Sequence, residues 1–314
     1  MKSSKLVTLV TAIYVATMFE FFGVARSAEG VALTGLTGGN TLVFFDSATP
    51  GSTTTRSVTG ADGLLGIDYR PADGQLYGIT NASVFTIDPS SGNATFFNSI
   101  SPTFNGGTTS GVDFNPAADA LRITGANGQN FRIPGGGSGT TMVDGTIAYA
   151  TTDTNAGVSP TITASAYTNS FAGAPAGRTT QLFDIDSNLD VLVLQNPANS
   201  GTLATIGSLG VNVGTVGGFD IFSPSSGVNI AFAAFAPSGS TAASLYTIDL
   251  SSGAATSLGQ IGTGAGFNLT GLAAPIPPTA VPEPSSLPGL IIVGIGTGWM
   301  LKRRKRKSSA ADKQ

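Results

Sequence analysis

Residues 66–71 read Gly-Ile-Asp-Tyr-Arg-Pro, and residues 111–116 repeat the pattern as Gly-Val-Asp-Phe-Asn-Pro. A third copy, Gly-Phe-Asp-Ile, occupies residues 218–221 and is followed by Pro224. The first spacing is 45 residues and the second is 107, or about twice 53, a period typical of β-propeller blades. We therefore expect a degenerate copy near residue 164, within Thr163–Tyr167.

A second repeated unit ends in a glycine turn between two strands. It is clearest as Val-Phe-Thr-Ile-Asp-Pro-Ser-Ser-Gly at residues 84–92 and Leu-Tyr-Thr-Ile-Asp-Leu-Ser-Ser-Gly at residues 245–253. Looser copies span residues 42–51, 131–136 and 191–201, so the mean spacing of the five copies is about 50 residues. Each period has room for four short strands. In the clearest period we expect these strands at Leu65–Tyr69, Gln75–Thr80, Ser83–Asp88 and Ala94–Asn98.

The two ends of the repeat region predict a closed ring. The first copy lacks its Gly-apolar-Asp strand and begins at Val31–Leu36, whereas a surplus segment, Asn268–Leu272, stands one period after Gly218. We expect this terminal strand to complete the first blade, because closure removes the exposed edges of a sheet. The fold class is then all-β, a propeller of five four-stranded blades over residues 29–273. A six-bladed ring and a two-sheet sandwich remain alternatives.

The body of the chain is acidic and poor in catalytic groups. Between Leu33 and Val281 it has five arginines, fourteen aspartates and neither lysine nor glutamate, a net charge of −9. Such a surface repels phosphate backbones, so we expect no nucleic-acid partner. The chain has no cysteine and no histidine, which excludes disulfides, thiolate catalysis and a Ser-His-Asp triad. We therefore expect a non-enzyme with no cofactor, and we assign no catalytic residue.

Both ends of the chain have the composition of targeting segments. Lys2 and Lys5 precede an apolar stretch, Leu6–Met18, and small residues follow, which indicates a signal peptide over residues 1–28. A Pro-rich linker over residues 274–286 leads to an apolar run, expected to form a transmembrane helix over residues 287–301. A basic cytoplasmic tail covers residues 302–314. The cations that should stop translocation are Lys302, Arg303, Arg304, Lys305, Arg306 and Lys307.

The C-terminal segment resembles the PEP-CTERM sorting signal of Gram-negative bacteria. The resemblance rests on the motif Val281, Pro282, Glu283 and Pro284, on the short apolar run after it and on the basic end. It implies processing by an exosortase, a membrane-embedded cysteine transpeptidase of exopolysaccharide-producing bacteria. The protein would then be exported, anchored transiently in the inner membrane and moved to the cell surface or outside, with exopolysaccharide as a further partner. A permanent C-terminal anchor is the alternative.

The body resembles a bacterial family called domain of unknown function 4394. The matching segments are Gly66–Asp68 with Leu76–Ile79, Gly111–Pro116 with Leu121–Arg122, and Asn196–Pro197 with Gly201–Leu203. The resemblance covers residues 32–273 and implies no activity. Our preferred interpretation is a structural or binding module of the cell surface. The alternatives are a calcium-dependent propeller hydrolase or lactonase, and a glycan-binding module.

Three aspartates recur at equivalent positions of the repeats and are candidates for a cation site. Asp68, Asp113 and Asp220 should point to the strand face opposite their apolar neighbours. We expect them to hold turns together by accepting hydrogen bonds from backbone N–H groups. The alternative is an acidic lining of the central channel that holds calcium.

Asp184 and Asp186 are two further metal candidates. They begin an alternating acidic pattern that resembles a calcium loop, but the sixth and twelfth positions are Leu189 and Gln195 in place of glycine and an acid. The same residues predict a β-hairpin, which we prefer. Arg122 and Arg132 stand in a body with few cations, and we expect each to pair with an aspartate.

Overall fold

The computed structural model describes residues 30–107, 109–173, 175–237 and 239–277. The chain divides into two units, Met1–Thr279 and Ala280–Gln314, and all described residues belong to the first. The expected signal peptide, sorting motif, transmembrane helix and basic tail lie outside the described residues. Within these four ranges, no helix has the length and apolar character needed to cross a membrane.

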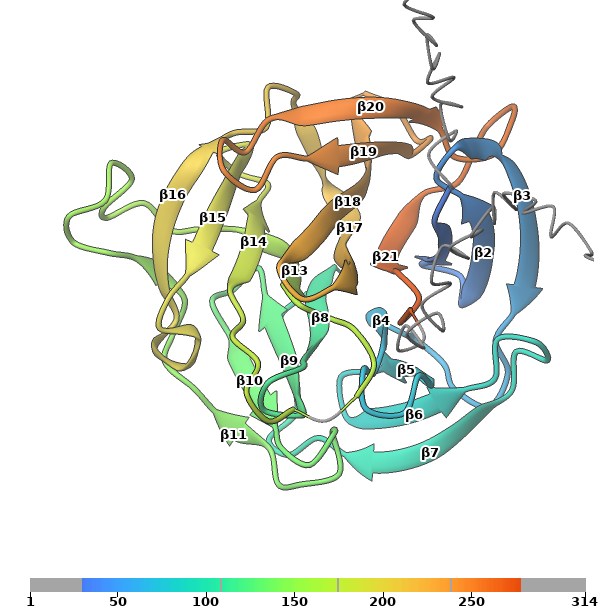
Figure 1. Cartoon of the computed structure of the whole chain (residues 1–314), viewed down its shortest axis with the longest axis horizontal. Helices are drawn as coiled ribbons and strands as arrows, with labels where there is room; N and C mark the ends of the chain where they lie inside the picture. Colours follow the sequence, from blue (N-terminus) through green and yellow to red (C-terminus); the bar gives the residue numbers. More distant parts are fainter. Residues whose placement is uncertain (1–29, 108, 174, 238, 278–314) are drawn as a thin grey trace, which may run out of the picture. The chain divides into compact units, whose positions relative to one another are not determined.

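The described strands form five sheets that surround a common centre as blades (Figure 1). From the innermost strand outward, blade 1 consists of β21 (Leu269–Ala273), β1 (Ala32–Thr37), β2 (Thr41–Asp46) and β3 (Thr49–Ser57). Blade 2 consists of β4 (Gly66–Tyr69), β5 (Leu76–Ile79), β6 (Ser83–Ile87) and β7 (Ala94–Ser99). Blade 3 consists of β8 (Ser110–Asn115), β9 (Ala120–Gly125), β10 (Asn130–Ile133) and β11 (Met142–Val143).

The last two blades complete the ring. Blade 4 consists of β13 (Ile162–Tyr167), β14 (Leu182–Asp186), β15 (Val191–Gln195), β16 (Thr202–Ser208) and β12 (Ala148–Tyr149). Blade 5 consists of β17 (Val213–Ser225), β18 (Val228–Pro237), β19 (Ser244–Ile248) and β20 (Ala255–Gln260). A short 3-10 helix, Ala198–Ser200, precedes β16.

The blade count expected from the repeats is confirmed, so the six-bladed ring and the sandwich are excluded. Each strand of the clearest period begins and ends within one residue of its expected position. The degenerate copy expected near residue 164 is β13. The prediction of four strands in every blade is wrong for blade 4, because β12 adds a fifth strand that runs parallel to β16. The two residues of β12 are too few to show an alternating pattern in the sequence.

The ring closes as expected. Strand β21 pairs antiparallel with β1, with Thr34 opposite Ala273 and Gly35 opposite Leu272. The last strand of the propeller therefore becomes the innermost strand of blade 1, and it joins the two ends of the repeat region without a covalent bond.

Apolar side chains fill four of the five gaps between neighbouring blades. Between blades 2 and 3, the ring of Phe114 packs edge-on against Tyr77 with 5.0 Å between ring centroids. Between blades 4 and 5, Phe183 and Phe219 belong to one buried cluster. A fifth cluster includes Ile162 and Leu203 and lies within blade 4 and the segment before it. Among the described residues, no apolar cluster joins blade 3 to blade 4.

Candidate functional site

A glycine places each recurring aspartate close to the next blade. Gly66, Gly111 and Gly218 each precede the aspartate of their inner strand by two residues, so glycine and aspartate lie on the same strand face. A Cβ atom at these glycines would lie 2.4 Å from Val112 Cγ2, 2.2 Å from Ser165 Oγ and 2.4 Å from Leu272 N, respectively. Those three atoms all belong to the inner strand of the next blade. The missing side chain therefore lets adjacent inner strands approach closely.

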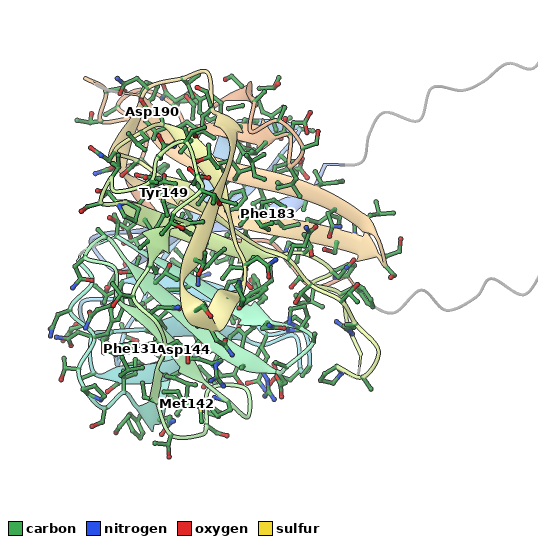
Figure 2. The ribbon with its side chains drawn as sticks, turned by 90° about the vertical axis from the view of Figure 1, so that its left-hand side faces the viewer. Phe131, Met142, Asp144, Tyr149, Phe183 and Asp190 are labelled. Atoms are coloured by element: carbon green, nitrogen blue, oxygen red, sulfur yellow. The ribbon has the colours of Figure 1, made fainter. Side chains whose placement is uncertain are left out.

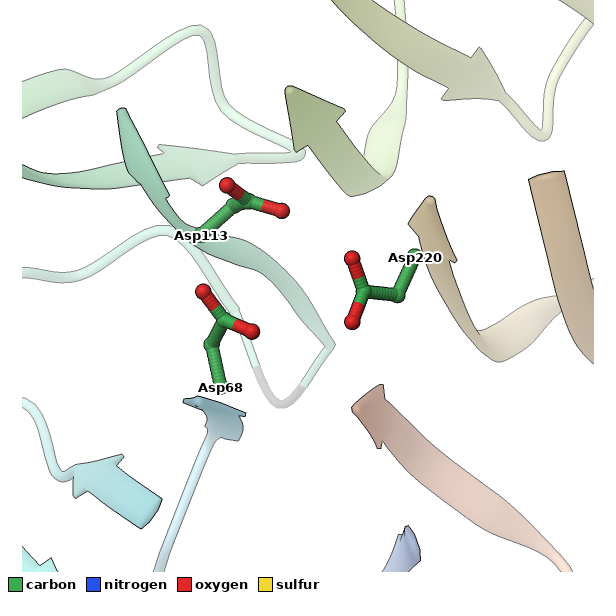
Figure 3. Close-up of side chains that lie close together, drawn as sticks. All are labelled: Asp68, Asp113 and Asp220. Carbon is green, nitrogen blue, oxygen red and sulfur yellow. The ribbon is translucent and has the colours of Figure 1, made fainter. Parts of the chain in front are cut away.

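This packing brings Asp68, Asp113 and Asp220 together at the centre of the ring. Each offers one carboxylate oxygen, and these three oxygens lie within 4.8 Å of one another. Figure 3 shows the three side chains turned toward one another from strands β4, β8 and β17. Their exposed fractions are only 2%, 1% and 3%. The three aspartates of the repeat pattern therefore lie together at the centre, where the alternative of a channel lining had placed them.

Each of these carboxyl groups also accepts hydrogen bonds from backbone amides of the next inner strand or its end. Phe114 N on β8 donates to Asp68 Oδ2 at 2.8 Å, and Ala274 N, just after β21, donates to Asp220 Oδ2 at 2.6 Å. The backbone N–H of Tyr167 on β13 bonds to Asp113. The carboxyl groups accept backbone hydrogen bonds as expected, but these bonds connect neighbouring blades and do not hold turns together.

Two blades lack this carboxyl group. The inner strands β13 and β21 carry Ala166 and Ala273 at the position that precedes the bonded amide. Each aspartate that follows such a blade bonds to the amide of its own next residue instead. Ile221 N donates to Asp220 Oδ1 at 2.6 Å, and the amide of Tyr69 bonds to Asp68. Each inner strand therefore has one amide, on the strand or directly after it, bonded to a central aspartate.

Burial keeps the cluster from carrying three charges. It raises the pKa of Asp68 and of Asp113 well above the usual range, and the charges of neighbouring aspartates raise both further. Burial raises the pKa of Asp220 to about 6, against the effect of the amides of Ala274 and Ile221, which stabilise its charged form. The neighbouring carboxyl groups of Asp113 and Asp220 affect each other in opposite directions, which raises the pKa of Asp113 and lowers that of Asp220. The cluster therefore holds protons at neutral pH.

Asp184 and Asp186 form the expected hairpin and not a calcium loop. Strands β14 and β15 pair antiparallel, with Asp186 opposite Val191. Tyr149 donates its hydroxyl to Asp186 Oδ2 at 2.6 Å, and Thr161 N and Asn188 N donate to Oδ1. These bonds fix Asp186 within blade 4. The structure does not bring these two aspartates into the central cluster.

The gap between blades 3 and 4 is polar, unlike the other four. Arg122 on β9 is 1% exposed and donates hydrogen bonds to Tyr167 Oη, Asn130 Oδ1, Asp144 Oδ2 and Asn199 Oδ1. Its Nη1 lies 2.7 Å from Asp144 Oδ2, and Arg132 pairs with the same carboxylate, as the sequence predicted for both arginines. Thr124 Oγ1 lies 2.6 Å from Ser165 Oγ in blade 4. Figure 2 views this side of the ring, with Asp144 below Tyr149 and Phe183.

The walls of this gap also carry four buried oxygen atoms with no hydrogen-bond partner among the described residues. They are Asp113 Oδ1, both carboxylate oxygens of Asp184, and Gln195 Oε1. Asp184 lies opposite Ser165 and therefore faces blade 3, and Gln195 shares that strand face. Burial raises the pKa of Asp184 to about 7, against the effects of the nearby Ser165 hydroxyl and the charge of Arg122. All four unpaired atoms are carboxyl or carboxamide oxygens, so the described donors of the gap leave some of its oxygens unpaired.

Sequence reasoning missed this polar gap. The signal was present, because Arg122 and Thr124 alternate with Leu121 and Ile123 on one short strand. Such an alternation normally indicates a solvent-exposed face. Here the polar face is buried, since blade 4 presents matching polar groups to it.

A pocket of about 390 Å³ lies at one end of this gap. Its lining comes from the ends of β8, β13 and β15, from the start of β14 and the segment before it, and from the segment that joins β15 to β16. Five carboxamide side chains and one phenol line it: Asn115, Gln181, Gln195, Asn196, Asn199 and Tyr167. The lining contains no carboxylate, ammonium or guanidinium group.

The fold and the site together define a closed five-bladed β-propeller with a buried carboxyl cluster on its inner strands. The chain belongs to the family described as Domain of unknown function (DUF4394), whose model matches residues 41–273. This confirms the resemblance found in the body of the sequence. No curated protein sequence matches the chain.

Solved structures show distant likeness. A chain of the nidogen/laminin complex is 12% identical with a TM-score of 0.46, over 79% of this chain and 99% of that one. A putative 6-phosphogluconolactonase from Bacteroides uniformis is 17% identical with a TM-score of 0.35, over 75% and 69%. Hydrazine synthase of Kuenenia stuttgartiensis is 12% identical with a TM-score of 0.37, over 63% of this chain and only 49% of that one. These likenesses are too distant to indicate a function.

Proposed function

We propose that this protein is an exported module of the cell surface or extracellular matrix, and that its propeller has a structural or binding role without catalysis. One observation carries the non-catalytic part. The one described group of three carboxyl groups that could share a metal ion is 1–3% exposed and bonded to backbone amides of neighbouring blades. A catalytic carboxyl group must reach its substrate, whereas these groups connect inner strands.

The sorting part of the proposal rests on the sequence of the two ends. The signal peptide would direct export, and the motif Val281–Pro284 would present Glu283 to an exosortase-like enzyme while the apolar run holds the protein in the inner membrane. Processing would then release or transfer the propeller to the cell surface, where exopolysaccharide is the expected neighbour.

Mass spectrometry of surface material tests this sorting step. We expect peptides up to about Ala280 and none that extend beyond Trp299. A variant with Glu283→Ala and Pro284→Ala should keep its tail and remain in the membrane fraction. Recovery of intact tails on the mature surface protein would instead show a permanent anchor.

A metal-dependent hydrolase is the second candidate, favoured by the convergence of three carboxylates and by the unpaired Asp113 Oδ1. Carboxylate oxygens suit calcium, which takes six to eight oxygen ligands. The donor set here fits poorly, because backbone N–H groups point at the same carboxylates and cannot coordinate a cation. The two candidates differ in one measurable property, since only a metal site requires saturable and selective binding of the ion.

A further inference from the structure

We propose that the pocket between blades 3 and 4 binds a neutral polyhydroxylated ligand, such as one sugar unit of a glycan. This inference deepens the binding role proposed above and rests on it. The pocket volume, about 390 Å³, lies within the range of small-molecule sites. The ligand class follows from the charge, the orientation and the hydrogen-bonding capacity of the lining groups.

Charge comes first. Behind the pocket, Arg122 is buried and pairs at 2.7 Å with Asp144, a carboxylate that Arg132 shares. No other ionised group contributes to the lining. An anionic ligand would find no free cation there and a cationic ligand would find no free carboxylate, so the lining favours a neutral molecule.

Two of the amide groups are held in fixed orientations. Asn199 accepts a hydrogen bond from Arg122 Nη2 at 2.6 Å through Oδ1, which leaves its Nδ2 as a donor. Gln195 donates from Nε2 to Ala198 O at 2.6 Å, and its Oε1 is a buried acceptor with no partner among the described residues. The oriented Nδ2 of Asn199, an exposed residue, is therefore a donor for a hydroxyl oxygen of a ligand, whereas Gln195 Oε1 is closed off from solvent.

The rim of the pocket carries two more amide side chains. Gln181 and Asn196 are exposed amides that can turn toward a ligand, and Leu194 and Pro197 supply apolar surface beside them. Sugars present hydroxyl groups at their edges and C–H groups on their ring faces. The mixture of amides with a small apolar surface therefore matches a sugar better than it matches a purely apolar ligand.

Titration of the full chain with neutral sugars tests the proposal, followed by saturation-transfer NMR. The probes are the methyl glycosides of glucose, galactose, mannose and N-acetylglucosamine, with glucuronate as the anionic counterpart. We expect saturable binding of at least one neutral sugar and weaker binding of glucuronate. A Gln181→Ala and Asn196→Ala double variant should weaken binding by roughly tenfold or more, or about 1.4 kcal/mol.

Two further variants keep the result interpretable. Asn188→Ala alters an exposed amide in the turn at the opposite end of the β14–β15 hairpin, so it should leave binding unchanged. Asn199→Ala removes the oriented donor of the lining and should weaken binding further; if it unfolds the protein, the exposed double variant decides. Absence of binding by all four neutral sugars, tighter binding of glucuronate, or equal binding by the double variant would overturn the proposal. None of these outcomes affects the sorting step, which mass spectrometry tests separately.

Discussion

At the residue scale, the central aspartates supply acceptors for backbone N–H groups that would otherwise be buried without a hydrogen bond. An inner strand has a ladder partner on one side only, so part of its backbone N–H groups point to the axis of the ring without a strand to bind. Asp68 bonds to the amide of Phe114 and Asp220 bonds to the amide of Ala274, which supplies the missing acceptors. The same bonds tie each inner strand to the next one.

Replacing Asp68 tests this role. Asp68→Ala leaves Phe114 N without an acceptor in a buried place, so we expect a loss of about 1–3 kcal/mol in the free energy of unfolding. Asp68→Asn keeps an oxygen acceptor and, like the protonated acid, has no charge, so its loss should be clearly smaller. Urea unfolding measures both, with the exposed Asp62→Ala as the control. Equal losses for the alanine and asparagine variants would argue against the amide bond as the stabilising interaction.

Asp184 should make the protein less stable as the pH rises. Burial raises the pKa of Asp184 to about 7 in the folded protein, whereas an unfolded aspartate has a pKa near 3.9. The folded state therefore binds more protons between these two values. Its free energy of unfolding should fall from about pH 4 to about pH 7, on the order of a few kcal/mol for this group, and level off above.

The matched variant is Asp184→Asn, which cannot ionise. We expect its free energy of unfolding, measured in urea at about pH 5 and about pH 8, to fall less than that of the parent protein. Some dependence should remain, because Asp220 titrates in the same direction with a pKa of about 6. An unchanged dependence on pH in this variant would mean that Asp184 is not the titrating group.

At the scale of the elements, the strands that repeat and alternate could be predicted from the sequence, and the short ones could not. The inner strands β4, β8 and β17 follow from one Gly-apolar-Asp pattern, and even the degenerate β13 follows from its spacing. Strands β11 and β12 have two residues each, too few for a period to appear. The convergence of the aspartates was predictable because equivalent positions of a ring face its centre. The polar pocket was not, because it depends on how two separate blades meet.

Gly218 tests the close packing of inner strands. A Cβ at this position would lie 2.4 Å from Leu272 N, so Gly218→Ala forces the backbone of β21 away from blade 5. We expect a loss of about 1–3 kcal/mol or more in the free energy of unfolding. Gly51→Ala is the control in another strand, since its nearest neighbour would be Gly262 O at 3.9 Å. If thermal unfolding gives both variants the same stability, the glycine of the repeat has no packing role.

At the scale of the whole molecule, the ring has four apolar gaps, one polar gap and a carboxyl cluster at its centre. The apolar gaps and the closure by β21 account for a stable ring. The gap between blades 3 and 4 is filled by buried polar groups, whereas the other four gaps are filled by apolar side chains. The pocket lined by amides lies at one end of this polar gap. The buried cluster connects the inner strands, and the pocket is the site that we propose for a ligand.

Calcium titration tests the central claim, that the inner aspartates connect the blades and do not form a metal site. A metal held by Asp68, Asp113 and Asp220 would raise the free energy of unfolding by about 2.7 kcal/mol at about a hundredfold excess over Kd, which shifts Tm by several degrees. We expect only the small change that screening of an acidic protein produces, reproduced by magnesium at equal ionic strength. A saturable, calcium-selective rise in Tm that Asp113→Asn abolishes would contradict the account and favour the hydrolase.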